Sequence, residues 1–395
     1  MVDYDGLAAM KELWDGDFPH VEGARCLNVR HAARACRMCV EACPADVISV
    51  PADKDPGQAP VVLDEAACAR CGLCLNVCPT QVFVQAELPE VSLLQRVVRT
   101  STPAVELACP RKESPDLSRV SEASVVQTPR CLAAISVPAL LDLAMTGKSV
   151  WLNDSLCHTC PIGEAQRGIQ HAITVANRWL QVMGSATTIR SYLTAAEELS
   201  DEPLPGPVEG SSLLMTRRGF FRSLTRRPER VAPPASSEDN HEFQHHISAQ
   251  RQHLAAALAQ LSPRPAARVP TAGLPINDLA VSDACTACAL CTALCPTEAL
   301  SWVSDEQYYV LNFSAALCLG EDCSLCVIGC PTHAVRFGQE VMADELLSTQ
   351  PRPVRAGRLG PCARCGALTE VPMATGETGK QPLCYRCQAE VVGSH

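Results

Sequence analysis

Four groups of cysteines, each ending in Cys-Pro, are the residues of this sequence best suited to chemistry. Two groups have the spacing C-x2-C-x2-C-x3-C-P, and a third has two extra residues after its first cysteine. The remaining group keeps the last three positions but has its first cysteine ten residues before the second. The groups are Cys26, Cys36, Cys39 and Cys43; Cys68, Cys71, Cys74 and Cys78; Cys285, Cys288, Cys291 and Cys295; and Cys318, Cys323, Cys326 and Cys330. This spacing is typical of bacterial iron–sulfur proteins and predicts four 4Fe–4S clusters that carry electrons.

The spacing follows from what a cubane cluster needs. Each iron takes one thiolate, and two-residue gaps let a tight loop bring three sulfurs to one cluster. The three residues before the last cysteine predict one helical turn, and the proline after it favours an extended chain leaving the loop. Apolar residues then predict a short strand after each proline, within residues 45–48, 80–83, 297–300 and 332–335. The repeated unit is therefore longer than the cysteines alone.

Because of these motifs, residues 26–85 and 283–338 resemble the bacterial dicluster ferredoxin family. In that family the fourth cysteine of each motif ligates the cluster of the other motif. The resemblance implies two ligand sets in the first module: Cys26, Cys36 and Cys39 with Cys78, and Cys68, Cys71 and Cys74 with Cys43. It implies two more in the second module: Cys285, Cys288 and Cys291 with Cys330, and Cys318, Cys323 and Cys326 with Cys295. The nine-residue gap after Cys26 departs from the family pattern. A displaced ligand is the favoured explanation, and a lost ligand is the alternative.

The region between the two modules predicts alternating strands and helices. Strands are expected at 104–108, 124–127 and 150–152, and helices at 137–145 and 164–183. This alternation predicts a small α/β domain with a parallel sheet.

Four more cysteines follow the predicted strand ends of this middle domain, where ligands gather in open parallel sheets. They are Cys109, Cys131, Cys157 and Cys160. An iron–sulfur cluster is the favoured interpretation. A zinc site, ordinary buried cysteines and a redox-active Cys157/Cys160 dithiol are the alternatives.

The middle domain resembles the delta subunit of methyl-viologen-reducing hydrogenase, a small iron–sulfur domain that partners heterodisulfide reductase-type enzymes. The matching residues are Arg130-Cys131, Pro138 with its helix, the strand leading to Cys157-His158-Thr159-Cys160, and residues 195–198. The resemblance covers about residues 103–198 and implies a 2Fe–2S cluster on Cys109, Cys131, Cys157 and Cys160. Because that family often has more thiols on its first strand, a fifth 4Fe–4S cluster is the alternative.

A different cysteine pattern lies near the end of the sequence. Cys362, Cys365, Cys384 and Cys387 form C-x2-C-x18-C-x2-C, a spacing typical of zinc sites. Gly366 permits the first tight turn, and the stretch between the pairs predicts the hairpin of a zinc ribbon. We expect one zinc to supply most of the stability of so polar a segment. Iron in a rubredoxin-like site is the alternative.

Composition limits the remaining interpretations. The 395 residues include 24 cysteines but only 4% aromatic residues, so clusters rather than one large aromatic core are expected to organise much of the chain. No signal peptide is recognisable, which favours metal-binding thiols in a reducing cytoplasm over disulfides. A net charge of −10 argues against general nucleic-acid binding, and no apolar run is long enough to predict a membrane span.

Two linkers are predicted, at residues 201–212 and 231–245. Between them, arginines alternate with apolar residues at 216–230. This pattern is typical either of a solvated helix packed on a neighbouring domain or of an amphipathic segment that docks on an acidic partner. Its twin-arginine pattern does not predict export, because no apolar run follows. Residues 247–261 predict a helix without chemistry, and His241, His245 and His246 are not expected to be ligands.

These observations predict an α+β multidomain protein with two ferredoxin-like dicluster modules, a small α/β parallel-sheet domain between them and a C-terminal zinc-ribbon-like hairpin. The expected units are a first module at 1–90, a middle domain at 100–200, a linker with the basic segment at 201–275, a second module at 276–345 and the zinc ribbon at 358–392.

The sequence lacks recognisable nucleotide-binding, serine-hydrolase and metalloprotease motifs, so no catalytic site is expected. The favoured function is an electron-transfer subunit between a catalytic redox partner (hydrogenase, formate dehydrogenase or heterodisulfide reductase-type) and another carrier, with the middle cluster bridging the two cubane pairs. An accessory protein that matures a metal-containing oxidoreductase is the alternative. A purely structural cluster protein is the third and least favoured.

Overall fold

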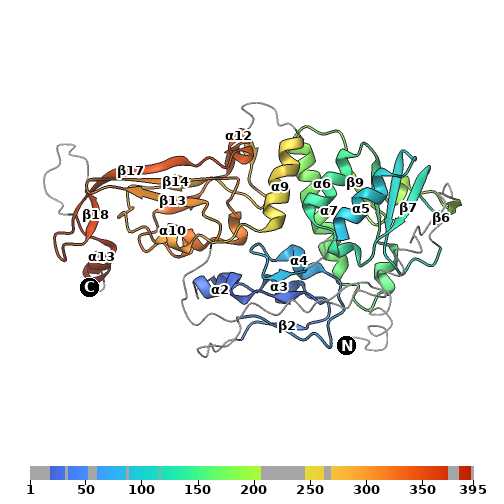
Figure 1. Cartoon of the computed structure of the whole chain (residues 1–395), viewed down its shortest axis with the longest axis horizontal. Coiled ribbons are helices and arrows are strands. Elements are labelled where there is room, and N and C mark those ends of the chain that lie inside the picture. The colour runs from blue at the N-terminus through green and yellow to red at the C-terminus, as the bar shows by residue number, and fades with distance from the viewer. Residues whose placement is uncertain are drawn as a thin grey trace, which may run out of the picture.

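The computed structural model describes residues 18–31, 34–51, 60–85, 89–114, 117–205, 245–261, 268–371 and 382–392. The basic segment at 216–230, most of both predicted linkers, His241 and most of the stretch between the C-terminal cysteine pairs lie outside these residues. The chain combines short helices with several small sheets, as the α+β prediction requires. In Figure 1 the second module lies at one end of the long axis, the middle domain at the other, and the first module below and between them. None of the described helices has the length and apolar character needed to cross a membrane.

The two modules share one pattern of antiparallel strand pairing. In each, the strand before the first cysteine motif pairs with the strand after the second, and the two strands between the motifs pair with each other. The pairs of the first module are β1 (His20–Val21) with β4 (Phe83–Val84), and β2 (Ile48–Ser49) with β3 (Val62–Leu63). Those of the second module are β12 (Leu279–Val281) with β15 (Val335–Phe337), and β13 (Leu300–Ser304) with β14 (Tyr308–Phe313). The strands predicted after each Cys-Pro are confirmed.

Each cysteine motif also folds in the same way locally. A short helix carries the third cysteine and ends one or two residues before the fourth, which confirms the predicted helical turn. These helices are α3 (Met38–Ala42), α4 (Leu73–Val77), α10 (Leu290–Leu294) and α11 (Leu325–Ile328). The third residue after the fourth cysteine has a left-handed backbone in all four motifs, with φ between 51° and 57° at Asp46, Gln81, Glu298 and His333. This shared turn directs the chain from the helix into the following strand.

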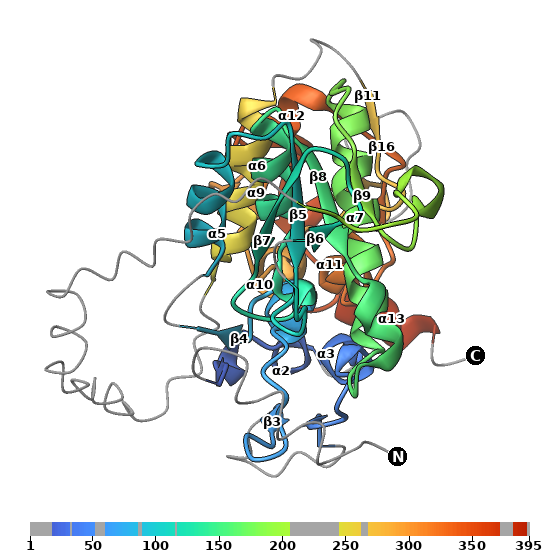
Figure 2. The same ribbon diagram turned by 90° about the vertical axis from the view of Figure 1, so that its right-hand side faces the viewer.

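The middle domain contains the predicted parallel sheet, in the order β7-β5-β8-β9 (Figure 2). Its strands are β5 (Ala104–Ala108), β7 (Ala123–Gln127), β8 (Ser149–Asn153) and β9 (Ile189–Ser191), and its helices are α5 (Pro89–Val98), α6 (Val137–Met145) and α7 (Ala165–Val182). Every residue of β5 is buried, as expected for a central parallel strand covered on both faces. Strand β9 was not predicted, because its three residues include Arg190 and Ser191. A separate two-stranded pair joins β6 (Leu117–Ser118) to β10 (Leu204–Pro205).

Helix α9 (Ala249–Gln260) connects all three parts of the molecule, although it falls within the predicted linker region. It packs on α6 of the middle domain and on α12 (Ala343–Leu347). The guanidinium of Arg251 is buried and donates hydrogen bonds to the carbonyls of Ala315, Ala316 and Pro275 in the second module. The Gln250 amide donates to Asn76 Oδ1 of the first module at 2.7 Å. The helix is therefore a structural junction.

The C-terminal region continues the sheet of the second module. Strand β17 (Arg352–Pro361) pairs with β14 on one side and with β18 (Leu368–Val371) on the other, and α13 (Tyr385–Val392) follows. The hairpin predicted between the two cysteine pairs falls mostly outside the described residues, and β18, at its start, pairs with a strand that precedes the first pair. A separate pair joins β11 (Arg268–Pro270) to β16 (Glu340–Met342).

Candidate metal centres

The thiols of the first module come together in the two sets that the family resemblance implies. Burial raises the pKa of the Cys39 thiol to about 12, and the nearby thiols of Cys78, Cys36 and Cys26 raise it in the same direction. The displaced Cys26 is therefore beside Cys36 and Cys39, despite the long gap. Helix α2 (Leu27–Arg30) fills this gap, and its Asn28 side chain bonds to both the N–H and the carbonyl of Cys36, at 2.6 and 2.9 Å.

The second set of the first module is also assembled. Burial raises the pKa of Cys74 well above its ordinary value, and the charges of Cys71, Cys68, Cys43 and Cys39 add to this effect. Crowding of buried thiolates is unfavourable without a cation, and iron removes that cost by coordinating them. The two donor sets therefore fit iron–sulfur clusters.

The second module repeats the arrangement. Burial raises the pKa of Cys326, as do the neighbouring thiols of Cys318, Cys323 and Cys295. These four thiols also line one small cavity, which provides space among the proposed ligands.

The other set of the second module forms around Cys291. Burial raises the pKa of Cys291 to about 12, with further contributions from Cys285, Cys288 and Cys330. In both modules the fourth cysteine of each motif thus lies beside the first three cysteines of the other motif.

Polar donors that the sequence analysis missed surround these sulfurs. Backbone N–H groups donate to the Sγ atoms of Cys78 and Cys330 from Val82 and Ala334, at 3.3 and 3.2 Å. Threonine hydroxyls lie 3.7 to 3.8 Å from the sulfurs of the Cys-Pro-Thr sequences, in the pairs Cys78/Thr80, Cys295/Thr297 and Cys330/Thr332. The recurring Cys-Pro-Thr was the signal that could have identified them. Such donors stabilise the thiolate form and tune cluster potentials.

The four thiols of the middle domain are neighbours too. Burial raises the pKa of Cys131 well above its ordinary value, and Cys71, Cys157 and Cys109 act in the same direction. Burial likewise raises the pKa of Cys109, with a contribution from Cys160. Cys71 belongs to the first module, so the middle-domain thiols lie next to its second set.

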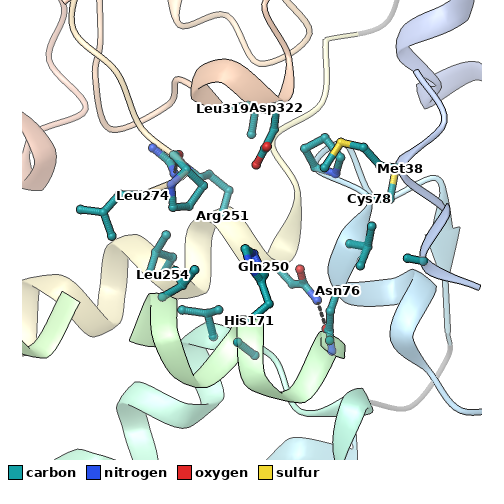
Figure 3. A pocket seen from close by; sticks show the side chains of 18 of the residues that line it. Met38, Asn76, Cys78, His171, Gln250, Arg251, Leu254, Leu274, Leu319 and Asp322 are labelled. Carbon is teal, nitrogen blue, oxygen red and sulfur yellow. Dashed lines mark hydrogen bonds between the residues drawn. The ribbon is translucent and has the colours of Figure 1, made fainter. Parts of the chain in front are cut away.

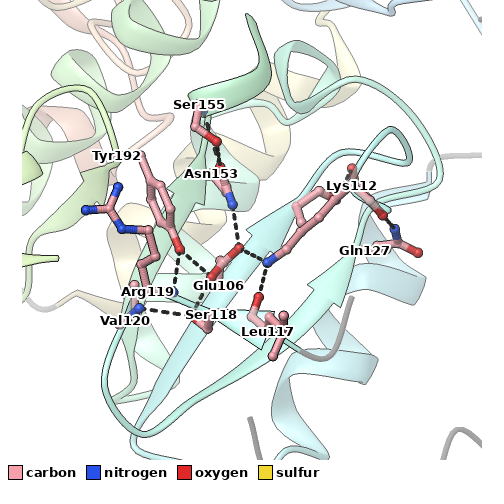
Figure 4. Close-up of polar contacts among 12 residues, drawn as sticks. Glu106, Lys112, Leu117, Ser118, Arg119, Val120, Gln127, Asn153, Ser155 and Tyr192 are labelled. Atoms are coloured by element: carbon pink, nitrogen blue, oxygen red, sulfur yellow. Dashed lines mark hydrogen bonds and ion pairs between the residues drawn. The ribbon is translucent and has the colours of Figure 1, made fainter. Parts of the chain in front are cut away.

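A polar network orders the strand ends that carry these thiols (Figure 4). The Glu106 carboxylate, fully buried on β5, pairs with Lys112 Nζ at 2.5 Å and accepts hydrogen bonds from Asn153, Ser118 and Tyr192. Since Asn153 ends β8 and Cys109 follows β5, the network fixes the two strand ends relative to each other.

A second buried carboxylate lies nearer to these thiols. Asp154 accepts the Leu193 N–H and the side-chain amides of Gln166 and Gln170. Burial raises the pKa of the Cys157 thiol to about 12, and the negative charge of Asp154 acts in the same direction.

The two modules meet directly at their cysteine motifs. Leu27 of the first module packs in one apolar cluster with Leu319, Cys323 and Leu325 of the second, and Cys36 borders this cluster. The charges of Cys71 and Cys131, of Cys39 and Cys74, and of Cys291 and Cys326 act on each other's sets, and Cys36 borders the apolar cluster that contains Cys323, so the thiol sets follow one another from the middle domain through the first module to the second. The middle-domain thiols lie at one end of this series. The prediction placed them between the two cubane pairs, whereas the first module lies between them and the second module.

A cavity of about 590 Å³ lies at the junction of these parts (Figure 3). Met38 and Cys78 of the first module, His171 of α7, Arg251 of α9 and Asp322 of the second module are among the residues that line it. Burial raises the pKa of Asp322, although His171 opposes the shift.

The C-terminal quartet has a different geometry. The ligand atoms of Cys362, Cys365, Cys384 and Cys387 all lie within 4.8 Å of one another, and among the described residues no other such group is found. Cys365 Sγ is 3.6 Å from Cys384 Sγ, close to the edge of about 3.8 Å for a tetrahedron of sulfurs about 2.3 Å from one zinc. The quartet thus fits a single ion, whereas the other sets fit multi-iron clusters, in which each thiolate binds a different iron.

These arrangements define an iron–sulfur protein with clustered ferredoxin-type cysteine motifs. Residues 34–82 match the 4Fe-4S dicluster domain family, in agreement with the sequence prediction for the first module. No curated protein and no solved structure matches the chain. Iron–sulfur electron transfer is the activity that the matched domain and the cysteine motifs support.

Proposed function

We propose that this chain is an electron-transfer subunit that relays electrons between a catalytic redox partner and another carrier. Four 4Fe–4S clusters would occupy the sets of the two modules, and the middle-domain thiols would hold a 2Fe–2S cluster or a fifth 4Fe–4S cluster. The partner would be a hydrogenase, formate dehydrogenase or heterodisulfide reductase-type enzyme in the cytoplasm. The substrate chemistry would occur on that partner, not on this chain.

One observation supports this proposal: the thiol sets follow one another from the middle domain through the first module to the place where the two modules pack together. Electron tunnelling falls steeply with distance, so a relay needs each centre beside the next. A structural role would not require such contacts between sets, nor the packing of Leu27 against Leu319 and Cys323 where the two modules meet.

The first test is the content of iron, zinc and acid-labile sulfide after anaerobic purification. On cubane stoichiometry we expect about sixteen irons from the modules, and about two or four more from the middle domain. Fewer than about twelve irons in fully assembled protein would argue against a relay.

The second test separates relay from maturation. In the double variant Cys74→Ser/Cys291→Ser, a co-purifying partner should remain bound while electron flow to the second carrier stops. Retained flow would refute the relay. Transient association with a cofactor-free enzyme would favour the accessory alternative.

A further inference from the structure

Strand β18, which leads away from the first C-terminal cysteine pair, lies on a cysteine loop of the second module. The hydroxyl of Thr369, a fully buried residue, donates to the Thr286 carbonyl at 3.0 Å. The Glu370 N–H donates to the same oxygen at 3.4 Å. Thr286 lies between Cys285 and Cys288, so β18 contacts the backbone that presents both thiols.

A charged network reinforces this contact. Arg355 on β17 forms a bidentate pair with Glu370, at 2.5 and 2.9 Å, and also pairs with Asp283 at 3.1 Å. The Tyr309 hydroxyl donates to Glu370 at 2.5 Å. Arg355 thus ties both β18 and the segment just before Cys285 to the sheet of the second module.

The far end of this hairpin is closed by the C-terminal quartet. Pro361 pairs with Leu368, and the Cys362 N–H donates to the Ala367 carbonyl at 2.7 Å. Among the described residues, the apolar cluster here consists of Cys362, Cys384 and Cys387, with Leu383 packed against it. So small a cluster provides little stability, and a bound ion would have to supply it.

We propose that the ion held by Cys362, Cys365, Cys384 and Cys387 keeps β18 on the Cys285–Cys288 loop, and thereby controls access to the cluster of the Cys291 set. This inference rests on the proposed function, because it requires that the Cys291 set holds an iron–sulfur cluster. With the ion bound, Thr369 and Glu370 cover the loop. Without it, the end of the hairpin opens locally, and the neighbouring cluster becomes accessible while the others stay protected.

The test follows the release of iron to a ferrous chelator from anaerobically purified full-length protein. Cys387→Ser removes a ligand of the ion, and Thr369→Val removes the hydroxyl donor while leaving the quartet intact. Glu340→Gln, which alters an exposed ion pair with Arg268, is the control. Zinc and iron contents are measured in parallel.

We expect about four irons per chain to be released about tenfold faster in Cys387→Ser and in Thr369→Val, the latter with its zinc retained. Electron paramagnetic resonance (EPR) should show that the signal of one cluster is lost while these four irons are released. Unchanged release in zinc-free Cys387→Ser, unchanged release in Thr369→Val, or faster release of all iron would each overturn the proposal. Absence of iron from the wild-type protein would instead refute the proposed function.

Discussion

The guanidinium of Arg34 donates from Nε to the carbonyl of Cys323 at 2.8 Å, across 289 positions of the sequence. A second bond runs from Nη2 to the carbonyl of Asp322 at 2.7 Å. Arg34 lies two residues before Cys36, so the contact joins a cysteine motif of the first module to one of the second. Because both acceptors are backbone atoms, the contact fixes the path of the Cys323 loop.

Replacement of Arg34 should loosen this junction without removing a ligand. We expect Arg34→Ala to retain full iron content but to speed amide hydrogen exchange in residues 318–326 about tenfold. Hydrogen bonds from a charged donor contribute about 1.5–3 kcal/mol each when buried, and less at a half-exposed position such as this. The control is Arg37→Ala, which changes an exposed arginine of the same motif. Equal exchange in the two variants would contradict the assigned role of Arg34.

The pairing of thiols across motifs gives a second prediction. Because Cys78 lies with Cys39 and Cys43 lies with Cys74, Cys78→Ser should change the same cluster as Cys39→Ser. Cys43→Ser should match Cys74→Ser, and each variant should lose at most about four irons. EPR of the reduced proteins distinguishes the two groups. A Cys78→Ser spectrum that matches Cys74→Ser would mean that each motif ligates its own cluster.

Local features of the fold could be predicted because short-range constraints determine them. The Cys-x2-Cys spacing, the helical turn and the proline define every motif but the first within a short stretch of sequence, and the first is extended by the gap after Cys26. The apolar periodicity of 137–145 and 164–183 predicted α6 and α7 closely. The parallel sheet followed from their alternation with apolar strands.

Long-range contacts were not predictable in the same way. Helix α9 was recognised as a helix, but nothing local indicated that Arg251 would meet three carbonyls of the second module. The direct meeting of the two modules depends on Arg34 and Leu27, which lie in the long gap between Cys26 and Cys36, where the spacing of the motif does not constrain them. The pairing of β18 with β17, which belongs to a larger sheet, was not predicted either. These features depend on contacts between segments far apart in the sequence.

The buried carboxylate beside the middle-domain thiols gives a third prediction. Asp154 places negative charge near Cys157, which disfavours addition of an electron to a cluster there. Asp154→Asn should therefore raise the midpoint potential of that cluster, on the order of 60 mV for a one-electron couple. The control is Glu164→Gln, an exposed carboxylate paired with Arg167. A redox titration followed by EPR measures the shift, and equal potentials in both variants would exclude a role for the Asp154 charge.

The last prediction concerns the attachment of α9 to the middle domain. His253 Nε2 lies 2.6 Å from Asp142 Oδ2 on α6. This hydrogen bond raises the pKa of His253 above its ordinary value of 6.5; burial opposes the shift, and the charges of Asp142 and of Glu90 on α5 support it. A raised pKa in the folded state means that protonation of His253 favours folding. The stabilisation is therefore complete below the unfolded value and is lost as the pH rises through the raised value.

Anaerobic thermal unfolding of wild type and His253→Gln at two pH values checks this sign. At pH 5.5 to 6 (about half a unit or more below the ordinary histidine value), the wild type should unfold about 2 °C higher than the variant. Near pH 8.5 (about two units above that value), the difference should shrink, because neutral His253 keeps only a hydrogen bond. His20→Gln, which replaces an exposed histidine beside Glu22 and away from α9, serves as the control. A difference that grows with pH would mean that α9 is held to α6 by contacts other than the protonated His253–Asp142 pair.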